Sequence, residues 1–562
     1  MNFLTISKTH PVIKSILIFF CLMFPSISNA QNIKPWEGYW KGDLSVAGMQ
    51  LTLIFHVNPP TIEGNTSVYR STLDVPMQRL KNFKIDETKI QGEEITWRLS
   101  LPASFQGKRN AEGLLVGNWT QGGKSLPLTL RYSETLNSVK PQTPKPPYPY
   151  TSKSVDFSHP SGKLKFGGTL TYPDTNSVKI DAIAQSIYHL ARKTPNPADP
   201  TFKLPAVLLL SGSGPQDRDE TLGDHKPFAV WADFLTKLGF VVLRVDDRGV
   251  GSSTGDPKFL ESTTTASYVS DAQAAIRFLY TQPMVDTMRI FVMGHSEGAN
   301  VAVKLANAQT DISGVISLAG MTSSGVETSV FQNQINWKAL KLDSGLISGL
   351  SDLHREMIQL AFMVKSNQTA GDHTISDNST SSGQSKNDNS SNKNTPQQSE
   401  PSTSEYETLL KAYIAKNKSD KNLQRAYKYQ INLSNGAAKA TGAKSALNYL
   451  AQTYIGLATN PWTSYFLQSD PEIEFTELKN CDILMVQGSK DQQIDAIGTA
   501  KLVDKMNETG VGITYREFPG LNHLLQHCTT CDVSEYFNLD ETTAMEVMSF
   551  VGNWLTQRNQ LR

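Results

Sequence analysis

The chain lacks the features that mark several large classes of protein. Neither sign of charge is in excess, because 53 basic residues balance 53 acidic ones among 562. A nucleic acid or a charged membrane surface is therefore not favoured as a partner. No segment approaches the roughly 20 consecutive apolar residues of a membrane-spanning helix. These absences favour a globular protein that acts on a small molecule, and they leave its oligomeric state open.

Cysteine is scarce, with four residues in the whole sequence. Cys21 lies near the N-terminus, and the other three are Cys481, Cys528 and Cys531. An oxidising compartment allows a disulfide between Cys528 and Cys531 or between Cys481 and Cys528, and the sequence does not choose between them. The Cys-Thr-Thr-Cys pair with nearby His527 supplies fewer ligands than a zinc site needs. We expect no metal and no other cofactor.

The first 30 residues have the pattern of a secretory signal peptide. Lys8 and Lys14 precede an apolar stretch at 16–24, and the small-residue end Ser28-Asn-Ala30 precedes Gln31. This pattern predicts cleavage after Ala30 and export to the periplasm or the extracellular space. Cys21 follows bulky apolar residues, whereas a lipoprotein signal has a small residue there, so no lipid anchor is expected.

Residues 31–138 predict a small antiparallel β-domain. Short stretches of alternating apolar and polar residues are separated there by Gly and Asn turns. Four tryptophans are interpreted as core residues of this domain rather than as a ligand-binding face: Trp36, Trp40, Trp97 and Trp119. The following segment, 139–150, is rich in proline and predicts a semi-rigid linker.

The rest of the chain predicts an α/β domain with a helical insertion. In 151–324, strands that are apolar throughout alternate with helices, which indicates a parallel sheet covered on both faces. Residues 325–465 have helical periodicity instead and predict a cap. Within the cap, 366–405 is so polar that we expect a disordered loop. The α/β alternation resumes in 466–562.

One pentapeptide, Gly294-His-Ser-Glu-Gly298, lies between a strand pattern and a helix pattern. A serine on a sharp strand-to-helix turn, with small residues two positions away on either side, is typical of a nucleophile elbow. Such a turn exposes the hydroxyl of Ser296. It also directs the first amides of the helix toward the place where an oxyanion would form.

A base and an acid follow in the expected chain order. Asp491 comes after the apolar strand pattern 483–488, and His523 comes after the strand 513–518 and a Pro-Gly turn. The order Ser, Asp, His predicts a catalytic triad of Ser296, Asp491 and His523. Two alternatives are weaker: Asp495 lies deeper in its segment, and His527 lies one helical turn beyond His523.

Two glycine-rich loops accompany the triad. The first, 211–215, follows a strand at 204–210, and the amide of Ser213 is predicted to complete an oxyanion hole with that of Glu297. No Lys-Ser or Lys-Thr follows it at the spacing of a phosphate loop. The second, 246–255, does not open a helix as a dinucleotide site would. We expect its Arg248 to pair with a carboxylate beneath the active site.

The sequence carries five motif segments, at 211–220, 246–251, 294–298, 460–466 and 520–523. Together they resemble the secreted bacterial α/β-hydrolases described as serine-aminopeptidase-like esterases. The resemblance covers about residues 150–560, and some members also carry a preceding β-rich segment. It implies the α/β-hydrolase fold and hydrolysis of short-chain esters by Ser296, Asp491 and His523. The polar insertion 366–405 and the pair Cys528 and Cys531 depart from the family pattern.

These observations predict a serine esterase that forms an acyl-enzyme without metal or cofactor. Trp462 and Tyr465 are expected in the cap wall, where they could shape the substrate pocket. One rival is a serine peptidase, whose cleft would need an acid for a substrate ammonium. Another is a secreted glycan- or lipid-binding protein with a vestigial hydrolase domain. The candidate acids for the peptidase are Glu297, Asp217 and Asp219.

Overall fold

The computed structural model describes most of the chain, and the described residues fall in two compact units. One unit comprises residues 1–44 and 51–136, and the other comprises 45–50 and 137–562. The expected signal peptide and most of the expected polar loop lie outside the described residues. Those residues are 36–46, 49–64, 66–75, 80–100, 103–121, 124–133, 140–174, 203–255, 260–309, 311–375, 402–478 and 481–561.

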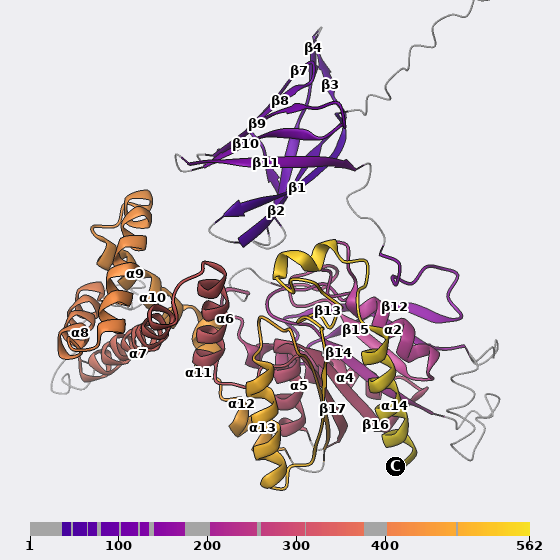
Figure 1. Ribbon diagram of the computed structural model, residues 1–562. Helices are drawn as coiled ribbons and strands as arrows, with labels where there is room; N and C mark the ends of the chain where they lie inside the picture. The colour runs from indigo at the N-terminus through magenta and orange to yellow at the C-terminus, as the bar shows by residue number, and fades with distance from the viewer. Residues whose placement is uncertain are drawn as a thin grey trace, which may run out of the picture. The chain divides into compact units, whose positions relative to one another are not determined.

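The N-terminal unit is a nine-stranded sheet in the order β6-β5-β2-β1-β11-β10-β9-β8-β7, with a small separate hairpin of β3 and β4 (Figure 1). The strand pairs recorded within it are antiparallel, as the alternating pattern predicts. The strands are β1 (Gly38–Val46), β2 (Met49–Val57), β3 (Thr61–Glu63), β4 (Thr66–Val68), β5 (Ser71–Val75), β6 (Leu80–Lys84), β7 (Glu87–Gln91), β8 (Glu94–Arg98), β9 (Ala103–Arg109), β10 (Leu115–Gln121) and β11 (Lys124–Ser133).

The tryptophans of this unit lie in and around its core. Trp40, Trp97 and Trp119 are buried, and Trp97 stacks on Phe55 with ring centroids 4.1 Å apart. Trp36 packs against the same core and is partly buried. The interpretation of these residues as core packing is therefore confirmed.

The C-terminal unit contains an eight-stranded sheet in the order β12-β13-β15-β14-β16-β17-β18-β19. Six strands run parallel, namely β14, β15, β16, β17, β18 and β19. At one edge, β13 is antiparallel to β15 and β12 is antiparallel to β13. This arrangement is the α/β-hydrolase fold that the resemblance implied. The strands are β12 (Tyr150–Ser158), β13 (Lys165–Pro173), β14 (Leu204–Leu210), β15 (Val241–Val245), β16 (Val285–His295), β17 (Ile312–Leu318), β18 (Asp482–Gly488) and β19 (Ile513–Phe518).

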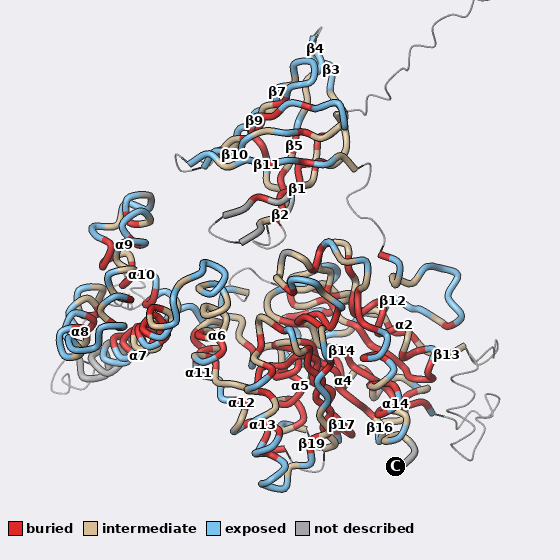
Figure 2. The backbone as a smooth tube through the Cα atoms, in the orientation of Figure 1, coloured by how far each residue is buried: buried red, intermediate tan, exposed pale blue. Residues whose placement is uncertain are grey.

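Helices cover both faces of this sheet, which is why its central strands are apolar throughout. Two separate buried clusters show the two faces, one packed by α4, α5 and α13 and the other by α2 and α14. Figure 2 shows the buried residues concentrated between these layers. The helices are α2 (Pro227–Lys237), α4 (Thr265–Tyr280), α5 (Glu297–Ala308), α13 (Ala496–Glu508) and α14 (Met545–Leu561).

The helical cap is inserted between β17 and β18 and has a hydrophobic core of its own. Its helices are α6 (Gly325–Ala339), α7 (Ser344–Ile375), α8 (Thr403–Lys416), α9 (Lys421–Thr441), α10 (Ala446–Thr459), α11 (Pro461–Gln468) and α12 (Pro471–Thr476). Within the described ranges, no helix combines the length and the apolar composition needed to cross a membrane.

The predicted polar loop, 366–405, needs a correction at both ends. Residues 366–375 belong to α7, and α8 begins at Thr403. Residues 346–364 of α7 are anchored in the cap core. Adding further turns to an established helix costs little, so the polar residues that follow extend it. The remainder, 376–401, lies outside the described residues.

The start of the proline-rich segment is held on the C-terminal unit. Lys140 is buried, and its ammonium donates hydrogen bonds to the carbonyls of Phe537 (3.2 Å) and Leu539 (2.5 Å). Gln142 exchanges further hydrogen bonds with the backbone of Thr542 and Thr543. Lys140 and Gln142 are thus packed on residues 537–543 of the C-terminal unit, so this part of the predicted linker is not free in solvent.

Candidate active site

Ser296 occupies a sharp turn between β16 and α5. Its backbone has φ 52° and ψ −121°, a strained region for a residue with a side chain. A Cβ atom at Gly294 would lie 2.1 Å from the carbonyl carbon of Gly298, and one at Gly298 would lie 2.1 Å from the carbonyl oxygen of Leu210. Both flanking glycines are therefore required, as the nucleophile-elbow pattern predicts.

His523 and Asp491 form a buried pair. His523 Nδ1 lies 2.7 Å from Asp491 Oδ2, and both side chains are almost completely shielded from solvent. Asp491 also accepts hydrogen bonds from the Gln487 amide (2.7 Å) and from the backbone N–H groups of Gln493 (2.7 Å) and Ile494 (2.9 Å). A carboxylate held in this way can fix the tautomer and orientation of an imidazole.

The loop that carries His523 is attached to the elbow. Nε2 of His295, the residue before Ser296, lies 3.1 Å from the carbonyl oxygen of His523. The centroids of the two imidazole rings are 4.9 Å apart. A direct hydrogen bond between Ser296 and His523 is not present in the described part of the chain. Such bonds often tighten only when substrate binds. The structure thus brings the three predicted triad residues to one edge of the sheet.

The two predicted oxyanion donors lie at one cavity with the serine. Ser213, Ser296 and Glu297 all line it. Glu297 begins α5, so its backbone N–H has no partner within the helix. The glycine-rich loop packs closely on the elbow, since a Cβ atom at Gly212 would lie 3.3 Å from the Cβ of Ser296. This geometry suits two amides converging on one oxygen.

The two alternative residues make other contacts. Asp495 caps the N-terminus of α13 by accepting a hydrogen bond from the backbone of Ile497 (3.1 Å). His527 is exposed and pairs with Glu541 (2.9 Å) and Glu546 (3.0 Å). Neither residue contacts the His523–Asp491 pair through these bonds.

The predicted substrate-pocket residues lie on α11. The Trp462 indole N–H donates to both carboxylate oxygens of Glu297, at 2.9 and 3.1 Å. The Tyr465 ring has its centroid 5.4 Å from the ammonium of Lys304. The cavity beside Ser296 is lined by Phe466 of the same helix, and neither Trp462 nor Tyr465 is among its lining residues. The motif 460–466 pointed to the right helix but not to the residue facing the cavity.

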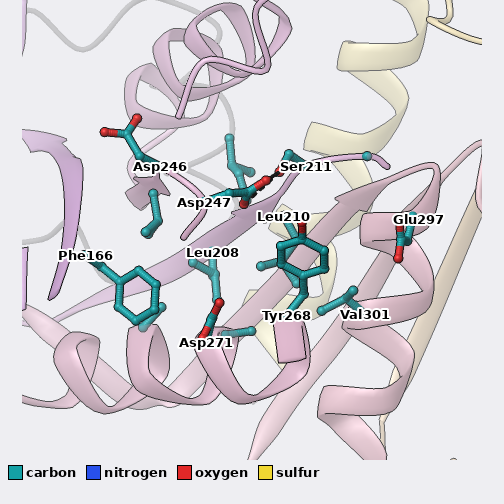
Figure 3. A pocket seen from close by; sticks show the side chains of 15 residues that line it. Phe166, Leu208, Leu210, Ser211, Asp246, Asp247, Tyr268, Asp271, Glu297 and Val301 are labelled. Carbon is teal, nitrogen blue, oxygen red and sulfur yellow. Dashed lines mark hydrogen bonds between the residues drawn. The ribbon is translucent and has the colours of Figure 1, made fainter. Parts of the chain in front are cut away.

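A second cavity lies beneath the glycine-rich loop (Figure 3). Asp247, on its wall, accepts hydrogen bonds from the Ser211 hydroxyl (3.3 Å) and the backbone N–H of Gln216 (2.8 Å), and burial raises its pKa well above the usual range. Arg248 makes two hydrogen bonds to Asp271, at 2.7 and 2.8 Å. The predicted pairing of Arg248 with a carboxylate is confirmed.

The loop beyond His523 carries the disulfide. It joins Cys528 to Cys531, which settles the choice that the sequence left open. The thiol of Cys481 instead lies 3.6 Å from the carbonyl oxygen of Asp482. Across the described ranges, no group of histidine, cysteine and acidic side chains is arranged to hold a metal ion.

The chain matches the family model described as "Serine aminopeptidase, S33" over residues 224–388. The esterase EstD of Thermotoga maritima is 36% identical over 115 residues, which are 20% of this chain and 26% of that esterase. A polyketide transferase of Aspergillus fumigatus is 30% identical over 118 residues, 21% of this chain and 37% of the transferase. The matched segments therefore span well under two thirds of these relatives.

Two solved structures are similar to this chain at low sequence identity and low TM-score. An α/β hydrolase from a Penicillium species is 15% identical, with a TM-score of 0.36, and the match covers 73% of this chain and 100% of that one. An esterase from Pyrococcus furiosus is 13% identical, with a TM-score of 0.35 and coverages of 73% and 91%. The sheet order of the C-terminal unit and the family match together support a serine-type hydrolase of the α/β-hydrolase superfamily.

Proposed function

We propose that the protein hydrolyses carboxylic esters through an acyl-enzyme on Ser296. The observation that carries this proposal is the buried hydrogen bond between His523 and Asp491, on a loop tied to the strained turn that holds Ser296. A strained turn of this kind costs free energy, and such strain is concentrated at functional sites.

In the proposed first half-reaction, His523 takes the proton of the Ser296 hydroxyl while the oxygen attacks the ester carbonyl carbon. The carbonyl oxygen becomes an oxyanion, which the backbone amides of Glu297 and Ser213 stabilise. The tetrahedral intermediate then expels the alcohol, which leaves with the proton from His523. The acyl group remains bonded to Ser296.

In the second half-reaction, His523 takes a proton from water, and the resulting hydroxide attacks the acyl-enzyme carbonyl. The bond to Ser296 breaks, the serine recovers its proton from His523, and a carboxylic acid is released. Asp491 stays ionised and keeps the imidazole oriented throughout. The cycle requires neither a metal nor a cofactor in any step.

The cavity beside Ser296 supports a short acyl group. Among the described residues that line it, Met321, Phe466 and Ile494 are apolar and the others are polar. A long alkyl chain would bury this polar wall without offering hydrogen bonds, which is unfavourable. The polar lining residues are Ser213, Thr265, Ser296, Glu297, Asn300, Lys304, Thr328, Gln332, Ser469 and Gln493.

The proposal is tested with p-nitrophenyl acetate, butyrate and octanoate and with a fluorophosphonate label. We expect turnover to favour acetate and butyrate over octanoate. Ser296→Ala should lose labelling, and its kcat should fall by about a thousandfold or more. Ser313→Ala is a matched control, because the Ser313 hydroxyl is buried on β17 and bonds the carbonyl of Met288. Wild-type protein that shows neither turnover nor labelling would contradict the proposal.

A serine aminopeptidase using the same groups is the second candidate. Of its three possible ammonium-binding acids, Glu297 alone lines the cavity beside Ser296. Asp217 accepts backbone hydrogen bonds within its own turn, and Asp219 pairs with Lys226 and Arg244. Aminoacyl p-nitroanilides assayed beside the simple esters separate the two activities. Faster hydrolysis of the anilides than of the esters would favour the peptidase.

We also propose export, on the sequence pattern of residues 1–30. N-terminal sequencing of the protein recovered from its native host tests it. Gln31 as the first residue supports cleavage after Ala30, and an N-terminus that retains residues 1–30 contradicts it.

A further inference from the structure

A second buried acid and histidine lie beside the proposed triad. Glu220 Oε1 is 2.9 Å from His295 Nδ1, and the two side chains are 2% and 9% exposed. His295 is the last residue of β16 and directly precedes Ser296. Glu220 has φ 51°, a conformation that L-residues seldom adopt, so its side chain is placed here at a conformational cost.

This pair connects three loops that the proposed reaction uses. Glu220 Oε1 also accepts a hydrogen bond from the backbone N–H of Gly212 (2.7 Å), in the loop that carries Ser213. Nε2 of His295 lies 3.1 Å from the carbonyl oxygen of His523. The oxyanion loop, the nucleophile turn and the base loop are therefore joined through two side chains.

The partners of His295 determine its protonation state. Nδ1 faces a carboxylate and Nε2 faces a carbonyl, and a carbonyl can only accept a hydrogen bond. A neutral imidazole has one N–H, so one nitrogen lone pair would point at an oxygen lone pair. With the Glu220 carboxyl ionised, both contacts are satisfied only when both nitrogens carry protons. The ring is then an imidazolium paired with the Glu220 carboxylate.

The electrostatic surroundings agree with this geometry. Burial lowers the pKa of His295, but the negative charge and hydrogen bond of Glu220 and the bond to His523 oppose it, so the pKa is raised overall. Asp491 acts in the same direction from further away. The imidazole of His523 is the other titratable group beside the ring.

Two other buried histidines have different partners. His225 bonds the Thr542 hydroxyl and the Tyr536 carbonyl, and His354 bonds the hydroxyls of Ser329 and Tyr454. Neither pairs with a carboxylate in these bonds, and burial lowers the pKa of each to about 4. They are neutral references within the same protein.

We propose that His295 is a protonated positioning residue. Paired with Glu220, it holds the oxyanion loop and the His523 loop in register with Ser296. The positioning role rests on the proposed function, whereas the protonation state of His295 does not. Removing the carboxylate should let His295 lose its proton at neutral pH, and the single N–H that remains can no longer hold both the side chain at position 220 and the His523 carbonyl.

The protonation state is tested by NMR on the full-length protein labelled with ¹⁵N-histidine. At pH 8 we expect His295 to carry protons on both ring nitrogens, and its signals are identified by their absence from His295→Gln. The exposed His527, which pairs with Glu541 and Glu546 and has a raised pKa, is identified separately with His527→Gln. His225 and His354 should show the pattern of neutral rings. A neutral His295 in the wild-type protein at pH 7 to 8 would overturn the proposal.

The positioning role is tested with Glu220→Gln, which keeps the size of the side chain and its bond from Gly212. We expect kcat for p-nitrophenyl acetate to fall about ten- to hundredfold at pH 8, with KM changed less than about twofold, because the groups that react are misplaced. The ratio of variant to wild-type kcat should rise as pH is lowered and His295 regains its proton.

His354→Gln is the matched control, since it replaces a buried histidine in the cap, and its ratio should not vary with pH in this way. A Glu220→Gln ratio that stays constant from pH 6 to 8 would reduce the pair to structural support and overturn the proposal. Failure of the esterase proposal is recognised separately, because wild-type protein would then show neither turnover nor fluorophosphonate labelling. The NMR result would still decide the protonation of His295.

Discussion

Two aspartates four residues apart give a sharp test at the scale of single residues. Asp491 bonds His523, whereas Asp495 caps α13. Asp491→Asn should lower kcat by about ten-thousandfold, because the amide no longer selects the required imidazole tautomer. Asp495→Asn should leave kcat within about twofold, since asparagine is an equally good helix cap. Ester turnover by both variants, with folding checked by circular dichroism, measures the difference. Equal losses in the two variants would count against Asp491 as the triad acid.

The residues of the proposed triad could be selected from the sequence because each follows an apolar strand and a tight turn. That signal depends on local pattern alone. Glu220 and His295 carry no such signal: Glu220 lies in an irregular loop, and His295 is a variable position of the elbow motif. Their significance comes from hydrogen bonds between segments distant in sequence. Phe466 was missed for a related reason, since only the packing of α11 determines which of its aromatic residues faces the cavity.

At the scale of elements, a glycine-to-alanine substitution in the elbow helix α5 and one in the cap helix α9 form a matched test. At Gly298 the new Cβ would lie 2.1 and 2.5 Å from the carbonyl oxygens of Leu210 and Ser211. We expect α5 to be pushed away from the oxyanion loop, with a loss of about 1–3 kcal/mol in stability and of most labelling at Ser296.

Gly436→Ala in α9 is the matched comparison. A Cβ atom there meets no other atom within 4 Å. Alanine restricts the unfolded chain and suits a helix interior, so stability should rise by about 0.5–1 kcal/mol. Thermal unfolding and fluorophosphonate labelling of the two variants measure both effects. A Gly298→Ala protein that labels as fast as wild type would show that the elbow tolerates a wider spacing.

Acid should loosen the helical cap through His354, which links α7 to α6 and α10 through Ser329 and Tyr454. Burial lowers its pKa to about 4, against an ordinary value of 6.5. Between these values the unfolded chain binds the proton more readily, so stability falls as pH drops from about 6.5 to 4. Through this residue the free energy of unfolding falls by about 3 kcal/mol over that pH range.

Hydrogen exchange of α7 and α10 at pH 7 and pH 5, corrected for the intrinsic rate, measures this loosening. The His354→Gln variant should be less stable than the wild type at pH 7, and its stability should change less with pH. The His295 contribution has the opposite sign, because a raised pKa gives stability that is retained in acid and lost at high pH. Cap protection that does not change between pH 7 and pH 5 would contradict the prediction.

The element types were predictable because periodicity reports which faces are buried. Continuous apolar strands such as β14 indicated a sheet covered on both faces. The length of α7 could not be obtained in the same way. Its residues 366–375 have the composition of a loop, and they are helical because they continue from a helix anchored in the cap core.

At the scale of the whole molecule, the residues proposed for catalysis all belong to the C-terminal unit. A protein consisting of residues 137–562 should therefore keep kcat for p-nitrophenyl acetate within about twofold. A shorter protein starting at residue 146 should lose about 2–4 kcal/mol of stability. It lacks Lys140 and Gln142, whose hydrogen bonds satisfy backbone groups of 537–543.

Thermal unfolding and ester turnover of the two truncated proteins measure these effects. Loss of kcat in the 137–562 protein would show that the N-terminal unit contributes to catalysis. Equal stability of the two proteins would show that the contacts of Lys140 and Gln142 contribute little.

The insertion of the cap between β17 and β18 determines when the proposed active site can be completed during synthesis. Ser296 belongs to the part of the sheet before the insertion, whereas Asp491 and His523 belong to the part after it. A ribosome must translate the whole cap, and nearly all of the remaining chain, before the nucleophile can meet its base. A nascent chain, or a fragment released by premature termination within the cap, would hold the serine without the groups that activate it. The proposed esterase activity would therefore be absent until synthesis of the chain is almost complete.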